Sequence, residues 1–280
     1  MTDAPAPFEP LAAQVRGHGD PVVCLHSSAG SSAQWRGLAK TLAERWQVLC
    51  PDLHGHGRSP AWPAGAGDTL HTDAAAVAAL AGPGRLHLVG HSYGAAVALQ
   101  IALRHPERVR SLTLYEPVLF GLLRRAPDCA DELGEIEDVA ASVSALVGAG
   151  CDEDAARVFT GYWGGAASWA ALSEAQRRTL AARVAVVPRH FRALFAARWD
   201  ATLLQRLRMP VLLLRGSATR APAARVAQLL ADALPQAQCR TLAGAGHLGP
   251  ITHAATVAHW MAAHVDPLLA RRLAAGALAA

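Results

Sequence analysis

The chain has 280 residues, of which 52% are apolar and 17% are charged, a balance typical of a folded protein with its own core rather than a disordered, fibrous or membrane chain. The formal charge of +4 comes almost entirely from arginines scattered along the sequence, whereas a nucleic-acid-binding protein usually gathers its positive charge into one patch. We therefore expect neither a nucleic acid nor a membrane as partner.

The ends of the chain and its cysteines indicate the expected cellular compartment. Met1 to Pro10 is rich in proline and lacks the basic start and apolar run of a signal peptide, and no stretch is long and apolar enough to span a bilayer. The five cysteines show no paired or metal-like spacing, which fits reduced thiols. Cys24 and Cys50 lie in apolar runs and are expected to be small buried side chains. The expected location is the cytoplasm, and the alanine-rich tail after Pro267 is expected to be helical or loosely ordered.

Short apolar runs alternate with amphipathic stretches along the chain, which is typical of a parallel sheet covered by helices on both faces. The predicted strands are Val22–Leu25, Gln47–Cys50, Leu86–Val89, Ser111–Leu114, Val211–Leu214 and Cys239–Leu242. The predicted helices among them are Ser32–Arg45, Thr69–Leu80, Tyr93–Arg104, Pro222–Leu234 and His253–His264. The pattern therefore predicts an α/β fold.

The alternation stops between about Pro117 and Leu207, where no convincing strand occurs. Three stretches there have helical patterns, namely Ile136–Val147, Asp152–Trp163 and Ser173–Arg198. We interpret residues 118–205 as an inserted all-helical cap on a core formed by residues 1–117 and 206–280.

The segment Gly90-His91-Ser92-Tyr93-Gly94 joins a predicted buried strand to a predicted helix. A sharp turn from strand to helix lifts a serine hydroxyl above the sheet, and a side chain at either glycine would collide with a neighbouring element. Ser92 is therefore predicted to be a catalytic nucleophile. The alternative is a serine that only caps the helix.

With this segment the sequence resembles the α/β-hydrolase family, and two other segments share the family's marks. Leu25–Gly30 matches the family's His-Gly-x loop after an early strand, and Pro51–Ser59 matches its glycine-rich turn after the next. The resemblance covers nearly all of the chain outside the cap. It implies the α/β-hydrolase fold, a mostly parallel doubly wound sheet with an inserted all-helical cap, and a hydrolase that needs no cofactor.

The resemblance also implies an oxyanion hole formed by the backbone amides of Ser28 and Tyr93. Each donor of this kind typically contributes about 3 kcal/mol to catalysis. Ser27 departs from the family, which usually has glycine there. The hydroxyl of Ser27, or that of Ser28, is a candidate for a polar contact with substrate; the alternative is that both hydroxyls bond backbone groups of the loop.

A serine hydroxyl needs a neighbouring imidazole to take its proton, and His247 is the predicted base. It follows the last predicted strand, so it leaves the sheet at the same carboxyl edge as Ser92. It also falls where the family keeps its catalytic histidine. The alternative is an ordinary loop histidine.

Four other histidines near these motifs have different interpretations. His26 and His91 are read as packing or loop-orienting groups. His54 and His56 are close enough in sequence to suggest a metal site, but no other ligand cluster has metal-like spacing. We expect no metal.

The third catalytic group must be a carboxylate that orients the imidazole. Most of the family supply it just after the strand that here is Val211–Leu214, where this sequence has Thr219. The strand after the nucleophile helix runs parallel to the nucleophile strand and ends at the same edge, which puts Glu116 beside Ser92. Some family members, including one subgroup of the haloalkane dehalogenases, are similar in placing a Glu here.

Glu116 is therefore the predicted acid, and the alternative is that it only caps the entry to the helical region. Asp52 is the rival, in a turn where the family normally uses the Asp to organise backbone amides. Asp200, near the return from the cap, is a weaker rival.

A serine at the elbow argues against the alkyl-enzyme chemistry of haloalkane dehalogenases and epoxide hydrolases, which use a carboxylate nucleophile. The predicted reaction is attack of Ser92 on an ester carbonyl, with His247 relaying the proton, and the predicted substrate is a small to medium hydrophobic carboxylic ester. Carbon–carbon bond hydrolysis of dienoic ring-cleavage products and cofactor-free peroxidation use similar parts. A non-catalytic hydrolase-like binding protein is the alternative suggested by the absent carboxylate at position 219.

Aromatic side chains of the cap could shape an apolar acyl or aryl pocket. For most of them plain packing within the cap is the alternative, because they recur at helical spacing. They are Phe159, Tyr162, Trp163, Trp169, Phe191 and Trp199.

Overall fold

The computed structural model describes residues 9–269 except 64, 66, 68 and 235, so most of the N-terminal segment and of the alanine-rich tail lie outside the described residues. Within them, seven strands form one sheet in the order β1-β3-β2-β4-β5-β6-β7. Strand β1 is antiparallel to β3, and every other neighbouring pair is parallel. The strands are β1 (Ala13–Arg16), β2 (Pro21–Leu25), β3 (Gln47–Pro51), β4 (Leu86–His91), β5 (Val109–Tyr115), β6 (Val211–Gly216) and β7 (Gln238–Leu242).

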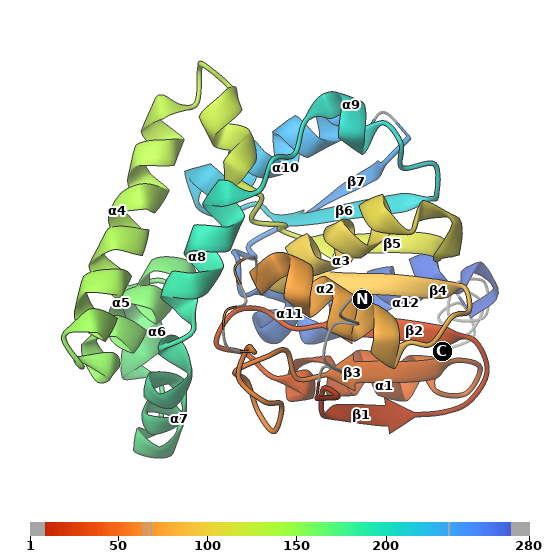
Figure 1. Cartoon of the computed structure of the whole chain (residues 1–280), viewed down its shortest axis with the longest axis horizontal. Helices are drawn as coiled ribbons and strands as arrows, with labels where there is room; N and C mark the ends of the chain where they lie inside the picture. The colour runs from red at the N-terminus through yellow and green to blue at the C-terminus, as the bar shows by residue number, and fades with distance from the viewer. Residues whose placement is uncertain (1–8, 64, 66, 68, 235, 270–280) are drawn as a thin grey trace, which may run out of the picture.

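Helices cover both faces of this sheet (Figure 1). On one face α2 (Thr69–Leu80) packs against α3 (Tyr93–Arg104), and α10 (Ala221–Ala233) contributes to the same core cluster. On the other face α1 (Arg36–Leu42) packs against α12 (Ala254–Val265). The predicted α/β fold with a mostly parallel sheet is confirmed.

Alternation of side chains along each strand creates the two faces. In β2, Val23 and Leu25 belong to the core cluster shared with α2 and α3, whereas Val22 and Cys24 belong to the cluster shared with α1 and α12. All four side chains are fully buried. A strand buried on both faces has a continuous apolar sequence, which is why the central strands were predictable.

The chain between β5 and β6 contains no strand among its described residues. The helices α4 to α8 gather beside the carboxyl ends of the parallel strands (Figure 1). They are α4 (Ala130–Gly148), α5 (Asp152–Gly164), α6 (Ala166–Ala170), α7 (Glu174–Val184) and α8 (Val187–Ala196), preceded by the 3₁₀ turn η3 (Phe120–Arg125) and followed by α9 (Ala201–Leu204). We call residues 118–205 the helical segment.

One predicted helix was wrong, and one strand was missed. The single helix predicted over Ser173–Arg198 is broken into α7 and α8, because Pro188 lies in the first turn of α8, where a missing N–H is tolerated but a continuing helix is not. Strand β1 was not predicted, since only four residues form it at the sheet edge and none of them is fully buried. No helix of the described part of the chain is long and apolar enough to cross a bilayer.

Candidate active site

Ser92 occupies the turn between β4 and α3, with φ 56° and ψ −121°. A positive φ at a residue other than glycine is strained and persists only where the surroundings enforce it. A Cβ at Gly90 would lie 2.5 Å from the Cα of Ala95, and a Cβ at Gly94 would lie 2.4 Å from the carbonyl oxygen of Leu25. The tight turn thus needs both glycines, as predicted.

The structure brings together Ser92, His247 and Glu116 from three separate loops. The Oγ of Ser92 lies 2.9 Å from Nε2 of His247, and Nδ1 of His247 lies 2.8 Å from Oε2 of Glu116. Because the carboxylate can only accept, Nδ1 carries the ring proton and Nε2 accepts from the serine hydroxyl. All three side chains are buried, so water competes little for these contacts.

Glu116 follows β5 with φ 43° and is fully buried. Its Oε1 accepts a hydrogen bond from the amide of Gly216 at 2.7 Å, and its Oε2 accepts one from the hydroxyl of Thr219 at 2.6 Å. The residue that stands in place of the family's usual acid therefore holds the carboxylate of Glu116. These donors compensate the carboxylate for its lost hydration.

The rival carboxylates have other partners. Asp52 accepts hydrogen bonds from the amides of Ser32 at 2.8 Å and Arg58 at 3.2 Å. Burial raises the pKa of Asp52, but these hydrogen bonds outweigh burial and leave its pKa below the ordinary value. Asp200 is about half exposed and accepts from the amide of Leu203. Both carboxylates organise backbone turns.

His26 joins the loop after β2 to the loop after β3. Its Nδ1 lies 2.7 Å from the carbonyl oxygen of Ser27, and its Nε2 accepts from the amide of Leu53 at 3.0 Å. Burial, reinforced by the positive field of His56, lowers the pKa of His26 to about 3. The ring stays neutral at working pH, and its loop-orienting role is confirmed by its hydrogen bonds.

His91 supports the loop that carries His247. Its Nε2 lies 2.8 Å from the carbonyl oxygen of His247, and its Nδ1 lies 3.0 Å from Nε2 of Gln34. Burial first, and then the charge of His247, keeps the pKa of His91 well below its ordinary value. A neutral ring that donates from Nε2 and accepts at Nδ1 satisfies both contacts.

The loop after β2 carries both serines of the predicted oxyanion region. The amide and hydroxyl of Ser27 both bond Oε1 of Gln34, at 3.2 and 3.3 Å, so its hydroxyl has a partner within the protein, although Ser27 still borders a cavity. The hydroxyl of Ser28 lies 2.7 Å from Nδ1 of His190 in α8. Ala29, with φ 56°, donates its amide to Nε2 of His56 at 3.1 Å.

His54 and His56 do not converge on a common point. Nδ1 of His54 bonds Oδ1 of Asp73 at 2.6 Å, and the other oxygen of Asp73 accepts from the hydroxyl of Tyr93 at 2.7 Å. Nδ1 of His56 bonds the carbonyl oxygen of His54 at 2.9 Å. The described residues contain no group of three or more His, Cys, Asp or Glu that could hold a metal ion.

Two cavities border Ser92, and both also include Ser28, Phe159 and Trp163 in their walls. The larger has a volume of about 220 Å³ and includes His247; the smaller has a volume of about 10 Å³. The larger is otherwise mostly apolar, with Leu172, Leu180, Leu248 and Ile251 among its walls, and the smaller is closed by Val118, Val187, His190, Phe191 and Leu194. An apolar cavity with a few convergent polar groups is the usual form of a small-molecule site.

Three of the six predicted aromatics line these cavities, namely Phe159, Trp163 and Phe191. The ring of Trp163 stacks on His247, with centroids 3.9 Å apart and planes 30° apart. The other three, Tyr162, Trp169 and Trp199, border neither cavity. The helical segment thus forms one wall of the space above Ser92.

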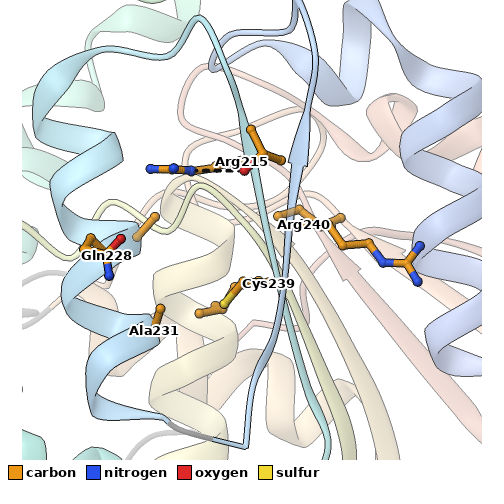
Figure 2. Close-up of a pocket in the computed structure, with 9 residues that line it drawn as sticks. Arg215, Gln228, Ala231, Cys239 and Arg240 are labelled. Carbon is orange, nitrogen blue, oxygen red and sulfur yellow. Dashed lines mark hydrogen bonds between the residues drawn. The ribbon is translucent and has the colours of Figure 1, made fainter.

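A separate pocket of about 90 Å³ lies between α10 and the β6–β7 edge of the sheet. Figure 2 shows Arg215 reaching toward α10 and Arg240 pointing to the other side of the strands. Cys239 borders this pocket, but burial raises the pKa of its thiol, which disfavours the reactive thiolate. Arg240 lies in the edge strand β7, where a charged side chain discourages pairing with other chains.

His190 was not singled out from the sequence, although a signal was present. The buried face of α8 consists of Val187, His190, Phe191 and Leu194, at the spacing of one helical stripe. A histidine within an apolar stripe indicates a buried polar contact, but its partner Ser28 lies 162 positions away. Gln34 was missed for the same reason, since only the folded loops bring it to Ser27 and His91.

Parts of this chain are similar to known proteins. In sequence, it is similar to pimeloyl-[acyl-carrier protein] methyl ester esterase of Aeromonas hydrophila, at 43% identity over 99 residues, which cover 34% of this chain and 37% of that protein. It is also similar to Lipase LipV of Mycobacterium tuberculosis, at 39% identity over 101 residues, which cover 35% and 37%. The matched stretch spans little more than a third of the length of these two relatives.

The fold is shared more widely than the sequence. Carboxylesterase CesB from Bacillus subtilis superposes with a TM-score of 0.69 at 17% identity, covering 93% of this chain and 90% of that one. A hydrolase from Pseudomonas aeruginosa superposes with a TM-score of 0.72 at 22% identity, covering 91% and 94%. A family model described as the alpha/beta hydrolase fold matches residues 20–254. With most of its length matched, the chain belongs to the α/β hydrolase fold family.

Proposed function

We propose that the protein is a serine hydrolase that cleaves small to medium, uncharged hydrophobic carboxylic esters through an acyl-enzyme. The observation that carries this proposal is the hydrogen-bonded series Ser92, His247 and Glu116 beside an apolar cavity. A nucleophile within reach of a base, with the base oriented by a third group, is the arrangement that acyl transfer requires.

In the proposed reaction Ser92 Oγ attacks the ester carbonyl while Nε2 of His247 takes the hydroxyl proton. Glu116 stabilises the imidazolium, and the amides of Ser28 and Tyr93 donate to the oxyanion. When the tetrahedral intermediate collapses, His247 gives its proton to the departing alcohol and leaves an acyl ester on Ser92. Water, activated by His247, then attacks this ester and releases the carboxylic acid.

The two cavities suggest where each part of the ester binds. Because His247 must reach the oxygen of the leaving group, we assign the alcohol to the cavity that His247 borders, of about 220 Å³. The acyl group then faces the cavity of about 10 Å³ beside Phe191, which favours short acyl chains. The helical segment acts as a cap that supplies Phe159 and Trp163 to both sides.

The walls of these cavities argue against a charged substrate. Neither cavity that borders Ser92 has a lysine or arginine among its described wall residues. A dienoic ketoacid carries a carboxylate whose burial without a cation would be costly. The observation supports an uncharged ester over carbon–carbon bond hydrolysis. The similarity to a methyl ester esterase and to a lipase also supports ester chemistry.

The test compares the wild type with Ser92→Ala and with Ser142→Ala, which removes an exposed serine of α4. We expect hydrolysis of p-nitrophenyl acetate and labelling by a fluorophosphonate probe in the wild type and in Ser142→Ala. In Ser92→Ala we expect no labelling and a fall in kcat of about 10⁴-fold or more. Wild-type protein that neither hydrolyses esters nor takes up the probe would favour a binding protein, and activity retained by Ser92→Ala would exclude this nucleophile.

A further inference from the structure

His190 of α8 contacts both residues whose amides face the proposed oxyanion. Its Nδ1 lies 2.7 Å from Oγ of Ser28. Its ring lies flat on the ring of Tyr93, with centroids 3.5 Å apart and planes 8° apart. A single side chain of the helical segment therefore contacts residues on both sides of the oxyanion region.

The surroundings of His190 fix its charge. The side chain is 1% exposed and is stacked on His56 at 5.4 Å between centroids. Burial is the largest cause that keeps the pKa of His190 well below its ordinary value. The ring is neutral, so one nitrogen carries a hydrogen and the other accepts.

The partners of the two nitrogens fix which one carries the hydrogen. Nε2 of His190 is buried and has no hydrogen-bond partner within the described part of the chain. An unpaired buried N–H is rarer in folded proteins than an under-used acceptor, so the hydrogen belongs on Nδ1. Nδ1 then donates to Oγ of Ser28, and the hydroxyl hydrogen of Ser28 is directed away from the imidazole.

Ser28 borders the same two cavities as Ser92. On the basis of the proposed function, we propose that His190 is a positioning residue that holds the Ser28 hydroxyl as a third hydrogen-bond donor to the oxyanion. The hydroxyl keeps its proton throughout, and its contribution is electrostatic, as for the backbone donors. The Ser28 side chain is then a catalytic group.

The test uses Ser28→Ala, His190→Phe and His190→Asn with p-nitrophenyl acetate. Ser28→Ala and His190→Phe are each expected to lower kcat by about 10- to 100-fold, with KM changed less than about threefold. The double variant is expected to be no worse than either single one, because both remove one interaction. His190→Asn, whose amide can donate near the position of Nδ1, is expected to recover most of kcat.

The chain offers a matched control in the pair His87 and Ser111. These buried side chains are also joined by a 2.7 Å contact from Nδ1 to Oγ, and Nε2 of His87 is also buried with no hydrogen-bond partner among the described residues. Neither borders the cavities beside Ser92. His87→Phe and Ser111→Ala should lower the melting temperature about as much as His190→Phe and Ser28→Ala do, but they should leave kcat unchanged.

The inference is overturned if Ser28→Ala keeps full kcat, or if the losses from Ser28→Ala and His190→Phe multiply in the double variant. If His190→Phe does not fold, the kcat values of Ser28→Ala and His190→Asn still test the inference. Ser92→Ala, measured alongside, distinguishes failure of this inference from failure of the proposed function. If ester hydrolysis depends on Ser92 and not on the Ser28 hydroxyl, only this inference fails, and if hydrolysis does not depend on Ser92, the proposed function fails with it.

Discussion

At the scale of single residues, the carboxylate contact to His247 comes from a different strand end than the family norm. Glu116 follows β5, and Thr219, in the loop after β6, donates its hydroxyl to the carboxylate. The two strands are neighbours in the sheet, with Tyr115 paired to Leu214, so one loop can replace the other. A carboxylate at position 219 would face Glu116 and repel it, which explains why a neutral donor stands there.

The acid assignment predicts opposite outcomes for two carboxylates. Glu116→Gln should lower kcat by about 10⁴-fold with little change in folding, because an amide cannot stabilise the imidazolium and favours the wrong tautomer. Asp52→Asn should instead destabilise the protein by about 2 kcal/mol, since it weakens charge-assisted hydrogen bonds to Ser32 and Arg58. Steady-state kinetics and urea unfolding of both variants check this. A well-folded Asp52→Asn as impaired in kcat as Glu116→Gln would make Asp52 the better acid.

At the scale of elements, the sequence predicted the features that depend on local residue patterns. Helix Thr69–Leu80 and helix Tyr93–Arg104 have the predicted bounds, because their apolar periodicity and flanking turns are local signals. The three loops that carry Ser92, Glu116 and His247 were predictable from the parallel order of strands. The contact between His190 and Ser28 was not, since it depends on how α8 packs against α2 and α3. The division of the chain into core and cap stays a prediction.

The packing of α8 predicts a change in substrate preference. Phe191 is 4% exposed and borders the small cavity beside Ser92, so Phe191→Ala should enlarge the space assigned to the acyl group. We expect kcat/KM for p-nitrophenyl hexanoate to rise at least tenfold relative to the acetate. Phe195→Ala is the matched control, because Phe195 stacks on Phe191 from the same helix and borders neither cavity. Equal preferences in the two variants would contradict the acyl assignment.

At the scale of the whole molecule, the fold keeps many histidines buried and uncharged. His26, His91 and His190 surround the candidate site, and His87 lies in β4 below it. All four have pKa values below the ordinary value of 6.5, with burial as the largest cause. His26 and His91 each accept one hydrogen bond at a ring nitrogen, so their contacts require the neutral ring. Stability is therefore linked to pH through groups that take no part in proton transfer.

This linkage predicts a loss of stability on mild acidification. Folding lowers the pKa of His26 to about 3 and that of His87 to about 4, so below pH 6.5 the unfolded chain binds protons that the folded chain refuses. Their contribution to stability is complete above about pH 7 and is lost as the pH falls toward these folded values. Between pH 7 and pH 5 each such histidine should lower the free energy of unfolding by about 2 kcal/mol.

Urea unfolding at pH 7, 6 and 5 measures this slope, with His87→Gln as the variant and His18→Gln, which alters an exposed histidine, as its control. His87→Gln should be less stable than the wild type at pH 7 but should lose about 2 kcal/mol less on going to pH 5. His18→Gln should follow the wild-type slope, because the exposed His18 side chain is not one of the buried rings. A wild-type free energy of unfolding that stays level or increases between pH 7 and pH 5 would show that the buried rings are protonated as readily in the fold as outside it.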